Sequence, residues 1–459
     1  MVENGKHKTI QVTNSRIGVV GDHAVIHGGI HIYHSGEQEG DPHDSEQIEA
    51  QHTAFDPANS INILHLSDLH FGAGKQSDPL SDASRWCGQL IDDLCGEFAC
   101  EQLHAVIISG DVGNFSEPGE YQAAEIFLEC LVEQFELNAS DLIIVPGNHD
   151  LNWKLSKKGY RLIDIEENDQ QPKKGHYIKV SEDVIRLRDD EKYLQRFQNF
   201  SRFHENVTGM GYPLVPRTQA TLHHFPELNL LIVGFNSSWE TDHYFRDRVS
   251  INPDAVEFAL SQIRERPDYQ NCLKFAVWHH PLYSPEEDRV KDFGFMHRLA
   301  QVEFNFCLHG HIHKADANLF RYDMGVEGRR INVIGAGTFG APIKEWTPGY
   351  PLQYNLLRLS NNMLRVETRR RIEINGTWEP DHLWRQGKGK PNLPYYDISF
   401  SGRSKPAPKP TTLPTKATGE TPARKSDSVL ESEIKVYHAK AESLHKSIPV
   451  AGFATHLKV

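Results

Sequence analysis

Short apolar runs recur along the middle of the chain, and each run is followed by polar residues. The first run, at 61–66, is rich in β-branched residues and predicts a buried strand, as do 105–108 and 142–145. Between them, residues 83–100 and 121–135 have apolar positions at helical spacing. This alternation predicts an α/β fold in which helices cover a sheet that is parallel in this part of the chain.

The pattern changes over residues 151–221, which are charged and rich in aromatic residues, with helical spacing over 189–204. We interpret this region as an insertion, a lid over the strand ends rather than part of a sheet. Apolar and polar residues alternate over 354–374, as expected of edge strands. Apolar strands are predicted between these two regions, at 230–235, 275–278, 304–309 and 331–334. The strands and helices together predict one domain over 59–400.

Both flanks differ from this domain in composition. Residues 1–58 join glycine-broken, histidine-containing β-type runs to an acidic linker, and predict either a small β-rich element for homo-oligomerisation or a flexible leader. Residues 401–429 form a linker rich in Pro, Lys and Thr, and 430–459 have a helix–strand pattern without a stop signal. We expect 430–459 to begin a further domain.

Composition excludes several classes of protein. The 459 residues carry a formal net charge of −13, unlike the basic balance of a protein that coats DNA. The six cysteines form no CxxC pair, so the sequence indicates neither a disulfide framework nor a thiolate zinc site. Apolar runs fall short of the ~18 residues that span a membrane. The N-terminus lacks the basic and then apolar stretch that is typical of a signal peptide. We expect a reduced, cytoplasmic protein that does not insert into membranes.

Metal-binding residue types follow five of the predicted strands. These are Asp68 and His70, then Asp111, then Asn148, His149 and Asp150, then His279 and His280, and finally His311 and His313. In α/β sheets the ligand site lies beyond the carboxyl ends of the strands. Nitrogen and oxygen ligands without thiolate suit Mn²⁺, Fe or Zn²⁺, and there are too many for one ion. The pattern therefore indicates a two-metal site of the kind that acts on phosphorus.

The ordered set of motifs resembles the calcineurin-like metallophosphoesterase family over roughly residues 61–374. The resemblance implies a β-sandwich of two sheets flanked by helices, with two divalent ions, Mn²⁺ first and Fe, Zn²⁺ or Ni²⁺ as alternatives. It also implies the ligands: Asp68, His70 and His313 for one ion, Asp111 as the bridge, and Asn148, His279 and His311 for the other. His280 remains the alternative to His279, because the two are adjacent.

The resemblance also implies two catalytic residues. His149 would lie beside the substrate and protonate the leaving alkoxide, with Asp150 orienting it from behind, while a hydroxide between the metals attacks phosphorus. Asn114 stands near a position where many relatives have a charged residue, and either a substrate contact or a turn explains it.

The motifs of this chain differ from those of one branch of the family, and the differences indicate a substrate class. Ser/Thr phosphatases of the family carry Asp-Arg after the second motif and Glu after Gly-Asn-His, whereas this chain has Gly113-Asn114 and Asp150. The motifs look more like the phosphodiesterase and nuclease branches, so we expect a nuclease or nucleotide phosphodiesterase. The acidic net charge argues against a broad duplex-DNA surface. Four basic residues near the motifs argue the other way: Lys314, Arg321, Arg329 and Arg330.

The flanks suggest partners. The N-terminal element is similar to leaders of bacterial conflict proteins, and the C-terminal segment looks like one that precedes NACHT-type NTPase modules in bacterial NLR-like defence proteins. This resemblance implies an antiviral effector domain governed by a C-terminal sensor module outside this chain. The alternative is a regulated, oligomerising nucleotide-binding module with little free hydrolase activity.

Overall fold

The computed structural model describes residues 55, 57, 60–73, 78–166, 172–285, 287–323, 328–360 and 362–400. The expected N-terminal element and the segments at 401–429 and 430–459 lie outside the described residues, and so do the partner interactions expected of them. Within the described ranges, no helix combines the length and the apolar character needed to cross a membrane.

The first large sheet contains the strands that precede the first three motifs. Its order is β15-β14-β13-β1-β2-β3, and β16 pairs with β14. The bounds are β1 (Ile61–Leu66), β2 (Ala105–Ile108), β3 (Leu142–Ile144), β13 (Leu352–Leu359), β14 (Met363–Arg371), β15 (Glu379–Pro380) and β16 (Tyr395–Ser399). β1, β2 and β3 are parallel, as predicted, and β13 runs antiparallel beside β1. The expectation of edge strands is therefore wrong for β13, which is buried along its whole length between β14 and β1.

The second large sheet contains the strands before the last two motifs. Its order is β11-β12-β10-β9-β8-β7, with β8, β9, β10 and β12 parallel and β7 and β11 antiparallel at the edges. The bounds are β7 (Ala220–Phe225), β8 (Leu230–Phe235), β9 (Leu273–Val277), β10 (Phe304–His309), β11 (Asp316–Arg321) and β12 (Arg330–Gly335).

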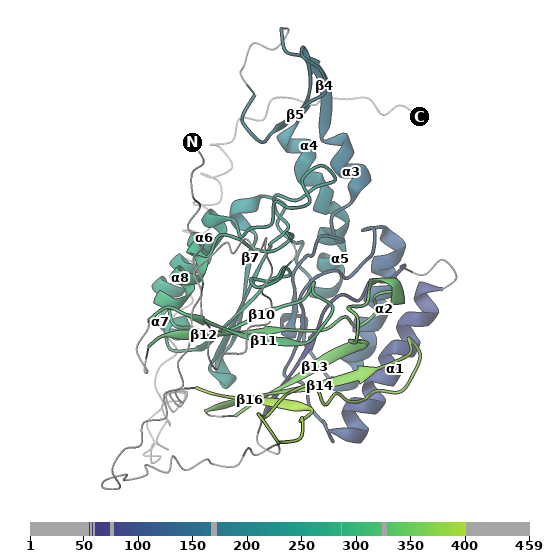
Figure 1. Ribbon diagram of the computed structural model, residues 1–459, viewed down its shortest axis with the longest axis vertical. Helices are drawn as coiled ribbons and strands as arrows, with labels where there is room; N and C mark the ends of the chain where they lie inside the picture. The colour runs from purple at the N-terminus through teal and green to yellow at the C-terminus, as the bar shows by residue number, and fades with distance from the viewer. Residues whose placement is uncertain are drawn as a thin grey trace, which may run out of the picture. The chain divides into compact units, whose positions relative to one another are not determined.

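The two sheets pack face to face around an apolar core. Ile63 and Ile107 of the first sheet join Phe275 and Phe306 of the second in one buried cluster. Helices α1 (Pro79–Glu97) and α2 (Pro118–Phe135) pack on the outer face of the first sheet, and α6 (Pro253–Glu265) and α8 (Gly294–Gln301) on that of the second (Figure 1). A short α7 (Pro267–Gln270) follows α6. The structure confirms the expected α/β sandwich of two sheets flanked by helices.

Helices α1 and α2 are covalently linked, which corrects the expectation drawn from cysteine spacing. Each helix begins with a proline, which suits the first turn because that position needs no N–H donor. Their packing brings Cys87 and Cys130, 43 residues apart, to a Cα–Cα distance of 6.4 Å, and the two form a disulfide. Spacing motifs could not reveal the pair, because it depends on how two helices pack. Disulfides are typical of oxidising compartments, so the reduced, cytoplasmic setting stays a prediction.

The region between β3 and β7 carries a small sheet of its own. Strands β4 (Tyr160–Asp164), β6 (Val184–Arg188) and β5 (Tyr177–Lys179) pair antiparallel in that order. Helices α3 (Trp153–Lys158), α4 (Asp190–Leu194) and α5 (Gln198–Thr208) accompany them, and β4 and β5 lie at the end of the molecule away from β13 and β14 (Figure 1). The expectation that this region contains no sheet is wrong, because β-branched and charged residues alternate here over runs too short to reveal strands. A lid role remains a prediction.

Candidate metal centre

The five motif loops leave the two sheets at neighbouring strand ends. Backbone hydrogen bonds tie the loops together: Asp68 N–H donates to the Gly110 carbonyl at 3.0 Å, and Gly310 N–H donates to the His279 carbonyl at 2.9 Å. Left-handed backbone conformations, which non-glycine residues rarely adopt, occur at Asp68, His70, Asp111, His311 and His313. Each such residue costs about 1–3 kcal/mol, and residues of this kind cluster at functional sites.

Two motif glycines are needed because the loops approach so closely. A Cβ atom on Gly147 would lie 2.6 Å from the backbone nitrogen of Asp111, and one on Gly310 would lie 2.7 Å from Asp68 Oδ2. Real side chains do not tolerate such distances. Glycine at these positions therefore lets motifs from different strands share one site.

Asp68, His70 and His313 form the first candidate group. Asp68 Oδ1 lies 3.2 Å from His313 Nε2 and 3.8 Å from His70 Nε2. The other ring nitrogens are fixed, because His313 Nδ1 donates to the Glu345 carbonyl at 2.6 Å and His70 Nδ1 donates to Asn114 Oδ1 at 3.2 Å. An imidazole whose second nitrogen is held in this way is oriented for metal binding.

His279 lies at the centre of the second candidate group. Its Nε2 lies 3.1 Å from Asp111 Oδ2, 3.2 Å from Asn148 Oδ1 and 3.2 Å from His311 Nδ1. Its Nδ1 donates to the Ser109 carbonyl at 2.7 Å. Four residues from four motifs thus converge on one point.

Two further residues adjoin this group. His280 is bonded through Nδ1 to the hydroxyl of Ser237 at 2.8 Å, and it also belongs to a candidate group with His279 and His311. Asp288 lies in the loop between β9 and α8, and its Oδ2 accepts from His311 Nε2 at 2.9 Å. Sequence reasoning missed Asp288 because it stands in no motif and only the fold brings it to His311.

The carboxylates and imidazoles in the centre shift each other's pKa values. Burial by itself raises the pKa of the Asp68 and Asp111 carboxyls, but the neighbouring imidazoles lower both values, that of Asp68 through His313 and that of Asp111 through His279. Burial by itself lowers the pKa of the two histidines, yet Asp111 raises that of His279 to about 9 and Asp68 raises that of His313 to about 9. Two buried carboxylates therefore attract positive charge into this space.

The donor set fits divalent metal ions. Asp68 Oδ1 and His70 Nε2 are buried and make no hydrogen bond within the described part of the chain, as expected of atoms that serve as metal ligands. Carboxylate oxygens and imidazole nitrogens suit borderline divalent cations. Three groups could hold an ion, with ligand atoms within 4.8 Å of one another: Asp68, His70 and His313; Asp68, Asp111 and His279; and His279, His280 and His311.

His149 lies beside the first group with its ring fixed. Its Nδ1 donates to the Asn114 carbonyl at 2.8 Å, its backbone N–H donates to Asp111 Oδ1 at 2.7 Å, and its ring centroid lies 4.8 Å from that of His70. Asn114 thus holds His149 through its carbonyl and His70 through its side chain. Sequence reasoning named Asn114 but could not assign it this contact with two histidines.

Asp150 binds backbone groups of the motif loops. Its buried carboxylate accepts hydrogen bonds from three backbone N–H groups of the motif loops, at 2.9–3.2 Å, those of Val112, Gly113 and Gly147. Burial and the charge of Asp111 raise the pKa of Asp150 to about 7. The expectation that Asp150 orients His149 is corrected, since the Asn114 carbonyl binds that ring nitrogen and Asp150 joins the second and third motif loops.

Part of the chain is similar in sequence to a curated phosphodiesterase. Glycerophosphodiester phosphodiesterase GpdQ of Enterobacter lignolyticus (strain SCF1) is 33% identical over 91 residues, which are 19% of this chain and 29% of that protein. The chain therefore matches less than a third of that relative's length.

Two solved structures show similarity at low sequence identity. PhoD has a TM-score of 0.40 at 9% identity, over 74% of this chain and 72% of that one. Vacuolar protein sorting 29 from Cryptosporidium parvum has a TM-score of 0.31 at 12% identity, over 74% and 98%.

A family model described as calcineurin-like phosphoesterase matches residues 61–315, more than half of the chain. The match covers all five motif loops with their ligand-type residues. Membership indicates hydrolysis of phosphoric esters at a metal centre. The chain belongs to the calcineurin-like phosphoesterase family.

Proposed function

We propose that this protein is a phosphodiesterase that needs two divalent metal ions, and that it cleaves nucleic acid or nucleotides. The observation that carries the proposal is the convergence of the motif residues into candidate groups that share Asp68 or His279. The phosphodiesterase relative supports the class of reaction.

Each ligand-type residue has a place in the proposal. Two ions, when bound, activate water near neutral pH and offset the negative charge of the phosphate. Asp68, His70 and His313 would hold one ion and Asn148, His279 and His311 the other, and Asp111 would serve both, because its carboxylate faces His70 as well as His279. Mn²⁺ is the expected ion, and Fe, Zn²⁺ and Ni²⁺ are the alternatives that suit the same donors.

His149 is the proposed proton donor. A diester leaves as an alkoxide, a poor leaving group that benefits from protonation in the transition state. Because the Asn114 carbonyl accepts from Nδ1–H, Nε2 is the ring nitrogen left for the substrate, and the proposed proton transfer from Nε2 requires His149 in its imidazolium form. The Asp111 carboxylate accepts from the His149 backbone N–H, which ties the proposed proton donor to a candidate metal ligand.

The test compares diesters with monoesters. We would strip the purified chain with a chelator, reload it with each metal, and measure hydrolysis of bis(p-nitrophenyl) phosphate, p-nitrophenyl phosphate, cyclic nucleotides and single-stranded oligonucleotides. We expect metal-dependent cleavage of diesters, including a nucleotide or oligonucleotide. A protein that binds two ions and cleaves only the monoester would overturn the proposal.

A further inference from the structure

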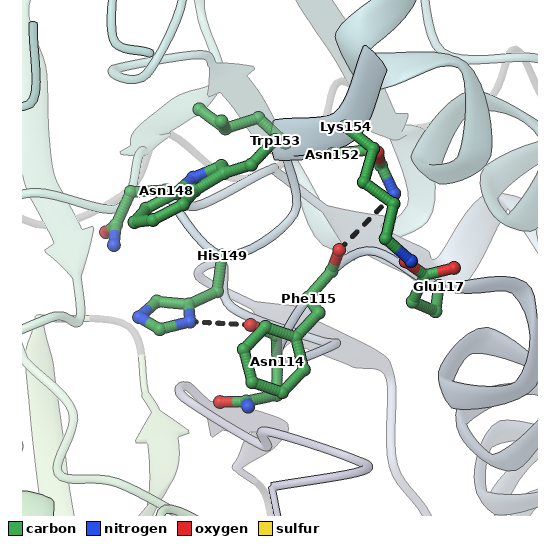
Figure 2. Close-up of a pocket in the computed structure, with 9 residues that line it drawn as sticks. Asn114, Phe115, Glu117, Asn148, His149, Asn152, Trp153 and Lys154 are labelled. Atoms are coloured by element: carbon green, nitrogen blue, oxygen red, sulfur yellow. Dashed lines mark hydrogen bonds and ion pairs between the residues drawn. The ribbon is translucent and has the colours of Figure 1, made fainter. Parts of the chain in front are cut away.

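A pocket of about 320 Å³ opens beside the metal centre. It lies between the loop after β2 and the start of α3, and its lining includes Phe115, His149, Leu151 and Trp153 together with Asn148 (Figure 2). His149 and Asn148 thus belong to both the pocket and the proposed active site. The pocket is therefore placed to receive a group next to a phosphate bound at the candidate metal centre.

Two aromatic side chains of the pocket are unusually exposed. The exposed fraction is 63% for Phe115 and 41% for Trp153. Figure 2 shows Trp153 above His149 in the view and Phe115 beside it. Large apolar side chains exposed together at a concave site are typical of ligand binding. Core packing does not explain them.

Hydrogen bonds join the two backbone segments that carry these rings. Asn152 caps the N-terminus of α3 by accepting from Leu155 N–H at 3.0 Å. Its side-chain amide donates to the carbonyls of Phe115 and Ser116, at 3.4 and 3.0 Å. Since Trp153 follows Asn152 directly, this residue joins the backbones that carry both rings. The pocket is therefore preorganised, which lowers the entropy lost on binding.

A cation lies at the Trp153 ring. The guanidinium carbon of Arg246 lies 4.3 Å from the centroid of the indole, and Arg246 is exposed. Such stacking fixes the ring plane and leaves positive charge at the rim. A flat ring carried by an anionic phosphodiester matches both features, whereas an alkyl chain gains hydrophobic contact but no stacking on the flat faces.

We infer that this pocket is a nucleobase subsite, in which the base of the leaving nucleoside stacks against Phe115 and Trp153 while His149 faces the scissile bond. The inference rests on the proposed phosphodiesterase function and adds the substrate class. Stacking of a base on an aromatic side chain contributes about 1–3 kcal/mol and tolerates every base. The subsite therefore selects for a base without selecting strongly among bases.

The first experiment uses matched diesters and the full chain loaded with Mn²⁺. The substrates are a dinucleoside monophosphate and its abasic analogue, in which hydrogen replaces the base of the leaving nucleoside. We expect kcat/KM for the base-bearing diester to exceed that for the analogue by roughly 5- to 150-fold. In the double variant Phe115→Leu/Trp153→Leu, the ratio of kcat/KM for the base-bearing diester to that for the abasic analogue falls toward one. Phe258→Leu, at an exposed position of α6, is the matched control and keeps the preference.

A second measurement does not depend on catalysis. Calorimetry compares binding of adenosine 5′-monophosphate and ribose 5-phosphate, which differ only in the base. Tighter binding of the nucleotide that disappears in the double variant supports the subsite even if no diester is cleaved. Equal binding of the two ligands overturns it. Metal-dependent cleavage of bis(p-nitrophenyl) phosphate with no preference for the base removes the subsite and leaves the phosphodiesterase proposal standing.

Discussion

The metal centre and the aromatic pocket adjoin each other but are built in opposite ways. In the metal centre, Asp111 is 1% exposed and His279 is fully buried, and the loops are held by strand ends and by each other. In the pocket, Phe115 and Trp153 project into solvent from a loop and from the first turn of a short helix. In the proposals made above, the reaction therefore relies on groups held by the sheets, whereas substrate choice rests on exposed residues that can change without disturbing the core.

The largest expected effect comes from Asp111, whose carboxylate faces histidines of both candidate groups. Asp111→Asn removes the charge that faces both His70 and His279, so diester hydrolysis falls by roughly 10³-fold or more. Steady-state kinetics and metal content by mass spectrometry measure the loss, with circular dichroism to confirm folding. Asp268→Asn, at an exposed position of α7, is the control and keeps activity. Near wild-type activity in Asp111→Asn would remove the bridging role.

The second effect separates proton donation from metal binding. His149→Ala lowers kcat by about 10²–10⁴-fold for diesters with alkoxide leaving groups, because the leaving oxygen then lacks a proton donor. The loss is much smaller for a p-nitrophenyl ester, whose leaving group needs no proton. Both metals stay bound. An equal loss on the two substrates would show that His149 positions the site rather than donating a proton.

The third effect concerns the residue that connects the two regions. Asn114→Ala removes the acceptor that holds His70 Nδ1–H, so metal affinity falls by about 10–100-fold. Asn114→Asp retains an acceptor oxygen and restores most of the affinity. Titration with Mn²⁺ measures both variants. If alanine leaves the affinity unchanged, the orientation of His70 is secured by Asp68 alone.

The smallest effect is expected at the pocket rim. Arg246→Leu removes an exposed stacking cation, so KM for a nucleotide diester rises by about 2- to 5-fold while kcat stays constant. Arg202→Leu, an exposed arginine of α5, is the control. A large fall in kcat instead would place Arg246 in the reaction and weaken the contrast between the two regions.

The sequence by itself determined the strands and the order of the motifs. The predicted bounds 61–66, 105–108, 230–235 and 304–309 coincide with β1, β2, β8 and β10, because β-branched and apolar runs buried on both faces have few alternatives. The family and its ligand-type residues were also readable, since each motif is local. The site roles assigned to those residues remain predictions.

Only the tertiary structure decided which distant residues meet. It placed β13 inside the first sheet, joined Cys87 to Cys130 and brought Asp288 to His311. In the folded chain, the Asn114 carbonyl rather than Asp150 binds His149 Nδ1. These outcomes depend on strand pairing and helix packing between segments far apart in the chain. Local patterns of apolar and polar residues do not encode such pairings, so the pocket next to the metal centre became visible only in the folded chain.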